Sequence, residues 1–294
     1  MTHHGTRAIW LAMGLAFLGN AGAMAAAGGV VTLGQNLSLG QRQQMLNYFG
    51  TSSSAVTILL VNNTEEHQLL DGIAPAREIG TRSISSAYVV PESSGYGIRV
   101  ATHNITWVTP AMYANALATA GLKNAKVVAA APFGVSGTAA LAGILLAYQK
   151  AVGVHLSSQQ TRTAAQEMVV TGNLGDAIHN KQQATQLVLL VKQEVVRQHL
   201  KTPQQIRPVV IQISNQLNLH LTSQQITEVT NLMVRIGALS LSYQSFSRQL
   251  SGIEREIRSG QSIWTQIVVW LEALWHQIMG FIHVSWIDLH HIFA

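Results

Sequence analysis

The sequence predicts an α+β protein with an N-terminal mixed α/β layer domain, an α-helical bundle-like domain and an amphipathic, tryptophan-rich C-terminal helix. Strand-like and helix-like segments alternate through residues 28–152, which is typical of layered α/β folds. Long helical patterns follow at 153–260. The last part, 261–294, holds four of the six tryptophans and no lysine or arginine. We therefore expect three parts behind an N-terminal leader.

Residues 1–27 have the pattern of a cleavable secretory signal peptide. Arg7 precedes an apolar run at 8–18, and Ala23-Met24-Ala25 supplies small residues for a signal peptidase. The alternative is an uncleaved membrane anchor, but the apolar run is shorter than the roughly 20 residues that span a bilayer. We expect export, and the protein is then either released or retained at the cell envelope.

The N-terminal domain has clear local start signals for its helices. Ser38 with Gln41 forms a capping box, Asn63 with Glu66 forms a second, and Thr109-Pro110 places proline at the first helical position. We expect helices at 38–49, 63–70, 109–121 and 138–151. Strands are expected at 30–33, 55–61, 83–90, 98–108 and 126–131, with a hairpin across 91–97.

The second half reads as four helices. They are expected at 157–172, at 176–200, from Thr202-Pro203 with a kink at Pro208, and from a cap at Thr222. Apolar residues recur every three or four positions from Ile226 to Ile257, which predicts one long helix. This seam either packs within the chain or mediates self-association through the Ile226–Ile257 helix.

The C-terminal segment predicts an amphipathic helix. Its tryptophans suit a membrane interface, while Glu272 and Asp288 interrupt any clean spanning stretch. The helix therefore either lies on a membrane or packs against protein. The candidate contact residues are Trp264, Trp270, Trp275 and Trp286.

Composition excludes several classes of protein. There is no cysteine, so disulfide scaffolds, thiolate metal sites, cysteine nucleophiles and lipoprotein anchors are all ruled out. The net charge of +5 is spread along the chain without a basic cluster, which argues against nucleic acid as a partner. A mild attraction to anionic wall polymers or lipid remains. No motif predicts a metal or a cofactor.

The turn between the last strand and last helix of the first domain is the candidate ligand-binding site. Its backbone amides and two hydroxyls can bind an anion at the start of a helix. It matches neither the nucleophile elbow nor the P-loop, so no catalytic residue is assigned. The alternative is a turn that only caps the helix. The candidate residues are Phe133, Ser136, Gly137 and Thr138.

Several stretches of the first domain resemble the YpuA-like secreted proteins of Gram-positive bacteria, a family defined by a domain of unknown function. The stretches are Val31-Thr32-Leu33-Gly34, Gln41-Arg42-Gln43-Gln44-Met45-Leu46, Tyr48-Phe49-Gly50, Ile79-Gly80-Thr81-Arg82-Ser83-Ile84-Ser85, Ala87-Tyr88-Val89, Asn104-Ile105-Thr106-Trp107-Val108-Thr109 and Ala131-Pro132-Phe133-Gly134-Val135-Ser136-Gly137-Thr138-Ala139-Ala140-Leu141. The resemblance implies an exported, envelope-associated protein. It transfers no catalytic residue.

Together these observations predict a secreted, envelope-associated binding or interaction protein. It would bind a cell-wall or membrane-surface component without catalysis, because charged catalytic clusters are missing from the sequence. The alternative is a hydrolase or transferase that acts on wall polymer and uses the turn at 132–138.

Overall fold

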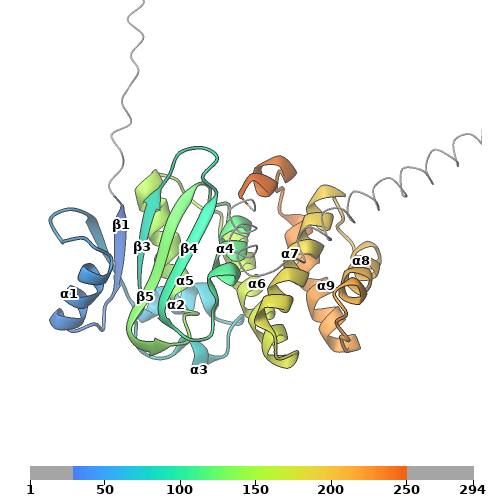
Figure 1. Cartoon of the computed structure of the whole chain (residues 1–294), viewed down its shortest axis with the longest axis horizontal. Helices are drawn as coiled ribbons and strands as arrows, with labels where there is room; N and C mark the ends of the chain where they lie inside the picture. Colours follow the sequence, from blue (N-terminus) through green and yellow to red (C-terminus); the bar gives the residue numbers. More distant parts are fainter. Residues whose placement is uncertain (1–28, 250–294) are drawn as a thin grey trace, which may run out of the picture.

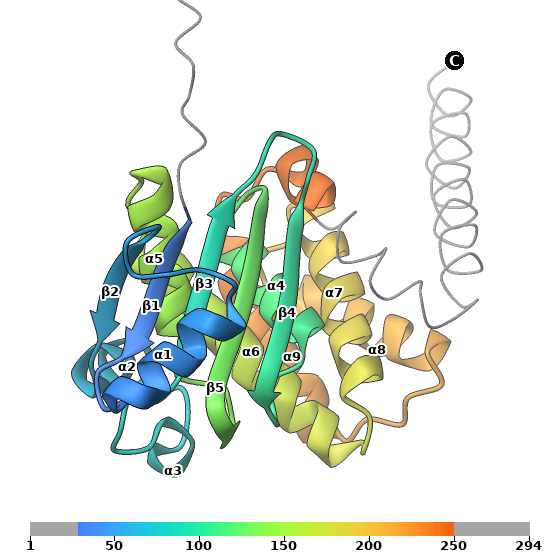
Figure 2. The same cartoon turned by 60° about the vertical axis from the view of Figure 1, so that its left-hand side comes forward.

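The computed structural model describes residues 29–249 (Figures 1 and 2). The predicted leader, the tail at 261–294 and its tryptophans Trp264, Trp270, Trp275 and Trp286 lie outside the described residues. Within the described range, a mixed sheet on the N-terminal side and helices on the C-terminal side confirm the predicted α+β class. None of these helices is long and apolar enough to cross a membrane.

The sheet has the strand order β2-β1-β3-β5-β4. The pairs β1–β2 and β4–β5 are parallel, whereas β3 runs antiparallel to both β1 and β5. Parallel neighbours need a crossover connection, and α4 supplies it between β4 and β5. The strands are β1 (Val30–Gly34), β2 (Thr57–Val61), β3 (Ser86–Pro91), β4 (Ile98–Ile105) and β5 (Ala125–Val135).

The expected hairpin across 91–97 is wrong, because β5 lies between the two strands it would join. The connection instead spans β5 and is held by the residue that precedes this strand. The Asn124 side-chain oxygen accepts the Gly95 and Gly97 N–H groups at 3.1 and 3.2 Å, and the Asn124 backbone carbonyl accepts the Glu92 N–H at 2.7 Å. Long-range strand pairing therefore overrides a local turn signal.

The predicted turn at 132–137 is also partly wrong, because β5 continues to Val135. The pairing with β4 shifts between His103 and Ile105 and then resumes between Ile105 and Val135. The Thr106 N–H and hydroxyl both donate to the Val135 carbonyl, at 2.8 and 2.9 Å. Only Ser136 to Ala139 then separate the strand from the next helix.

Helices cover both faces of the sheet (Figure 2). One face packs against α4 and α5, whereas α1 lies on the other face, over a cluster that includes Val31, Leu33 and Met45. The helices of this half are α1 (Leu39–Tyr48), α2 (Asn63–Leu70), α3 (Ala76–Ile79), α4 (Pro110–Thr119) and α5 (Ala140–Val152). The capping boxes form as local sequence predicts, except that the one on α2 uses Asn62 and Glu65, one residue earlier than expected.

The helical half differs from expectation at two breaks. Helix α6 runs through Gly172, and α7 starts later than predicted because Asn180 caps it. The expected continuous helix from Ile226 to Ile257 is wrong: α9 ends at Ala238, where Leu239 turns to an extended backbone. Self-association through this seam stays a prediction. The helices are α6 (Ser158–Ala177), α7 (Lys181–Arg197), α8 (Pro203–Gln216) and α9 (Ser223–Ala238).

One hydrophobic core runs through both halves of the described chain. The same cluster of buried side chains contains Val89 of β3, Ile144 of α5, Leu187 of α7 and Met233 of α9. Figure 1 shows α4 between the sheet and helices α6 and α7, and both of these helices pack against α4. The predicted boundary at 152–153 coincides with the end of α5, and its meaning as a domain boundary stays a prediction.

Trp107, in the loop after β4, connects the sheet half of the chain to helices α6 and α7. Its indole N–H donates to Asp176 at 2.6 Å, and its carbonyl accepts the Lys181 ammonium at 2.9 Å. Lys181 also lies 4.6 Å from the centre of the ring and pairs with Asp176 at 3.2 Å. The ring rests on α6 at Gly172, where no larger side chain would fit.

A buried ion pair joins α4, α6 and α7. The Lys192 ammonium lies 2.5 Å from the Glu167 carboxylate, and the two side chains are 0% and 1% exposed. Lys192 also donates to the Asn115 carbonyl at 2.8 Å and to the Thr119 hydroxyl at 3.0 Å, while Thr119 donates to the other Glu167 oxygen. Burial raises the pKa of Glu167 and lowers that of Lys192, and their mutual attraction opposes both shifts.

Replacing Gly172 by alanine should destabilise the protein. The new Cβ would lie 2.3 Å from the Trp107 ring, and overpacking of this kind costs about 1–3 kcal/mol. Gly40→Ala in α1 is the matched control, because nothing lies within 4 Å of its Cβ position; it should be neutral or stabilising by up to about 1 kcal/mol. Urea unfolding measures both, and equal effects would contradict the packing argument.

Replacing Lys192 by methionine should cost about 3–5 kcal/mol of unfolding free energy, because the Glu167 carboxylate then stays buried without a cation. The double variant Lys192→Met/Glu167→Leu should recover most of this loss, since both charges are gone. Urea unfolding of the two variants and the parent gives the comparison. A double variant as unstable as the single one would show that volume, rather than charge, dominates at this site.

Candidate functional site

The four residues predicted to bind a ligand in the 133–138 turn occupy different environments. Phe133 is 49% exposed on β5, whereas Ser136 is half-buried and Gly137 is buried. Thr138 is 0% exposed, and its hydroxyl oxygen has no hydrogen-bond partner. None of the four lines either of the two cavities described below. Their role in ligand binding stays a prediction.

The turn itself is built into the core. The Ser136 carbonyl accepts the N–H groups of Trp107 and Val108 at 3.2 and 3.0 Å, and the buried Tyr113 hydroxyl donates to the Gly137 carbonyl. Gly137 has a φ of +93° and packs against Ile105 and Tyr113, so a side chain there would meet both. These contacts fix the crossing from β5 to α5.

A second polar cluster, around Glu66, is also closed to ligands. The Ser83 hydroxyl donates to Glu66 at 2.6 Å, and both side chains are buried. Asn63 donates to the other Glu66 oxygen at 3.0 Å and to the Gly80 carbonyl at 3.2 Å. Burial raises the pKa of Glu66, while these hydrogen bonds oppose the shift. The cluster fastens the loop after α3 to α2.

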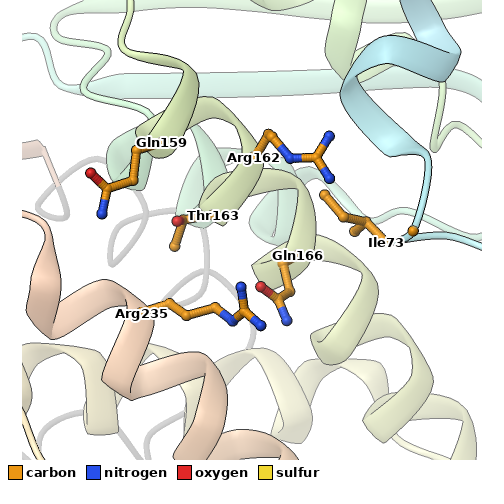
Figure 3. A pocket seen from close by; sticks show the side chains of 7 residues that line it. Ile73, Gln159, Arg162, Thr163, Gln166 and Arg235 are labelled. Carbon is orange, nitrogen blue, oxygen red and sulfur yellow. The ribbon is translucent and has the colours of Figure 1, made fainter.

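The site best suited to bind a ligand is a cavity of about 260 Å³ between α6, α9 and the loop after α2 (Figure 3). We call it the arginine cavity, because two arginines from different helices line it. The other lining side chains are mostly polar and uncharged. The lining residues are Gly72, Ile73, Gln159, Arg162, Thr163, Gln166 and Arg235.

Arg162, in the second turn of α6, is held rigidly. Its guanidinium donates to three carbonyls at the C-terminal end of α2, those of Gln68 at 3.1 Å, Leu69 at 3.4 Å and Asp71 at 3.0 Å. A cation is favoured there because the last carbonyls of a helix carry partial negative charge. The group is nevertheless exposed, and Figure 3 shows it extending toward the loop that carries Ile73.

Arg235, in the last turn of α9, reaches the cavity from the opposite side. Figure 3 shows its side chain extending toward Gln166. Among the described residues, neither Arg235 nor Arg162 forms an ion pair with a carboxylate. An arginine always carries its charge, so the cavity presents two positive groups that no carboxylate of residues 29–249 neutralises through an ion pair.

The chemistry of this lining favours anions. Guanidinium groups form charge-assisted, bidentate hydrogen bonds with carboxylates and phosphates, and the amides of Gln159 and Gln166 with the Thr163 hydroxyl add neutral donors. Metal ions need other ligands, and no group of His, Cys, Asp or Glu suited to hold one occurs in residues 29–249. The arrangement can bind an anion.

Sequence reasoning missed both arginines. Each is an isolated cation on a helix rich in Gln, Thr and Asn, and they are far apart in the chain. No spacing rule connects them, since only the packing of α9 against α6 brings them together. The one available signal was the absence of an acid three or four residues from either arginine on its helix.

Comparison with known proteins confirms the family resemblance. The family model described as "Protein of unknown function (DUF1002)" matches residues 33–253. The "Uncharacterized protein YpuA" of Bacillus subtilis (strain 168) is 34% identical over 258 residues, which cover 85% of this chain and 88% of that protein. No solved structure matches the chain.

Proposed function

We propose that this chain, which belongs to the DUF1002 family of proteins of unknown function, is an exported binding protein of the cell envelope that recognises an anionic ligand. The observation that carries the proposal is the arginine cavity. Arg162 and Arg235 both line this cavity, and neither forms an ion pair with an acidic side chain among the described residues. Burying part of a charged ligand between them replaces water by charge-assisted hydrogen bonds.

The lining of the cavity favours binding over catalysis. General acid–base chemistry needs a side chain that exchanges protons near neutral pH, and an arginine does not. Thr163 supplies the one hydroxyl of the lining, and no histidine or carboxylate stands among the lining residues to activate it. The proposal is therefore a non-enzymatic ligand-binding role.

The proposed location at the cell envelope rests on the sequence. The leader at 1–27 has the three-part pattern of a secretory signal. The polar, uncharged composition of the rest suits a protein outside the cytoplasm, where wall polymers and lipid headgroups supply abundant anions. The tryptophans of 261–294 are candidates for retention on a membrane surface.

Replacing Arg235 by glutamine should weaken the binding of glucuronic acid and of inorganic phosphate at least tenfold. A hydrogen bond to a charged group contributes about 1.5–3 kcal/mol, and about 1.4 kcal/mol corresponds to a factor of ten. Isothermal titration calorimetry at low salt measures the affinity. Lys126→Gln is the control, because it removes one positive charge from an exposed position on β5. Equal losses in both variants would mean that only net charge attracts the anion.

Fractionation of expressing cells tests the location. The full chain should be recovered outside the cytoplasm, whereas a chain that starts after residue 27 should stay inside, because it lacks the predicted signal. A third chain that ends at Gly260 separates the two roles of the termini: its release into the medium, with the full chain on the envelope, would identify the tail as the anchor. Cytoplasmic recovery of the full chain would contradict the proposal.

A further inference from the structure

A second cavity of about 400 Å³ adjoins the arginine cavity and shares Arg162 with it. It lies between α2, α5 and the first turns of α6, and we call it the leucine cavity. Apolar and polar side chains mix in its lining, which includes Leu145, Leu146, Glu65, Gln149 and Ser158. Typical ligand sites have volumes of roughly 300–1,000 Å³. The arginine cavity, at about 260 Å³, lies below this range and the leucine cavity, at about 400 Å³, near its lower end, so each suits one small unit.

Arg162 forms the border between the two cavities. Its hydrogen bonds to the end of α2 hold the guanidinium in place, yet the side chain remains exposed. A ligand with two joined units can therefore lie across this group, with one unit in each cavity. The rigid border fixes the distance between the units without any movement of the protein.

The charges of the two cavities differ. The arginine cavity has two cations and no lining carboxylate, whereas the leucine cavity contains the Glu65 carboxylate. One oxygen of Glu65 accepts the Asn62 N–H at 2.8 Å, and the other has no hydrogen bond within the described structure. A negative unit beside Glu65 would be repelled, whereas a hydroxyl could donate to its free oxygen.

The apolar side chains of the leucine cavity restrict the class of ligand further. A sugar ring presents hydroxyls at its edge and C–H groups on its face. The hydroxyls can form hydrogen bonds with Glu65, Gln149 and Ser158. The C–H groups can pack against Leu145 and Leu146. We propose that the ligand is a glycan with an acidic unit next to a neutral one: the acidic unit binds Arg162 and Arg235, and the neutral unit occupies the leucine cavity. This inference rests on the proposed function and specifies its ligand class.

Calorimetry with three probes tests the inference. A disaccharide of glucuronic acid and N-acetylglucosamine should bind at least tenfold more tightly than glucuronic acid alone. Tripolyphosphate, although it is also longer than a single anionic unit, should not show this gain in affinity. Ser158→Trp should remove the gain of the disaccharide while leaving the affinity for glucuronic acid unchanged, because it fills only the leucine cavity. Ser223→Trp is the matched control, since Ser223 is also an exposed first residue of a helix, α9.

The outcomes separate the two proposals. If neither the sugars nor tripolyphosphate bind, the proposed function fails; if tripolyphosphate alone binds, the anion site stands and the glycan inference is overturned. If glucuronic acid and the disaccharide bind equally, or if Ser158→Trp changes neither affinity, the anion site stands and the glycan inference is overturned. Tripolyphosphate that binds as tightly as the disaccharide and is equally sensitive to Ser158→Trp also overturns it. Gln68→Trp, from the α2 side of the same cavity, repeats the test should Ser158→Trp fail to fold.

Discussion

The buried ion pair between Lys192 and Glu167 is the constraint on which the rest of the structure depends. Two charges leave water completely only when every hydrogen-bonding group finds a partner, and here the Asn115 carbonyl and the Thr119 hydroxyl complete the set. These partners come from α4, whereas the pair itself joins α6 to α7. A shift of α6 or α7 would separate the two charges, and a shift of α4 would remove their remaining hydrogen-bond partners, so the pair selects one arrangement of the three.

Because α6 carries both Glu167 and residues of the arginine cavity, the ion pair also fixes the position of the binding site. Glu167 lies on the buried side of α6, while Arg162, Thr163 and Gln166 line the arginine cavity. The rotation of α6 that satisfies Lys192 thus also directs Arg162 toward the end of α2. Trp107 adds a second fixed point where its ring meets Gly172. The site is preorganised because the same helix serves the core and the cavity.

The sequence predicts well those features that depend on residues close together in the chain. The cap of α1 at Ser38 and that of α9 at Thr222 form as expected, because each involves residues only three positions apart. The place of β5 between β3 and β4 was missed, since strand pairing is decided across the whole sheet. The meeting of Arg162 and Arg235 was missed for the same reason: it depends on how α9 packs, which no local pattern records.

Because this chain has few charged residues, Arg162 and Arg235 keep their attraction for an anionic ligand. Charged residues make up only 11% of the sequence, against a typical value of about 25%, so few acids are available to pair with an exposed cation. In a protein of ordinary composition, an exposed arginine on a helix commonly meets a glutamate one turn away. Here the residues one turn away from either arginine on its helix are uncharged, so they compete weakly for a guanidinium. The attraction of both groups is therefore left for a ligand, and it reaches about 8–10 Å into solution at physiological salt.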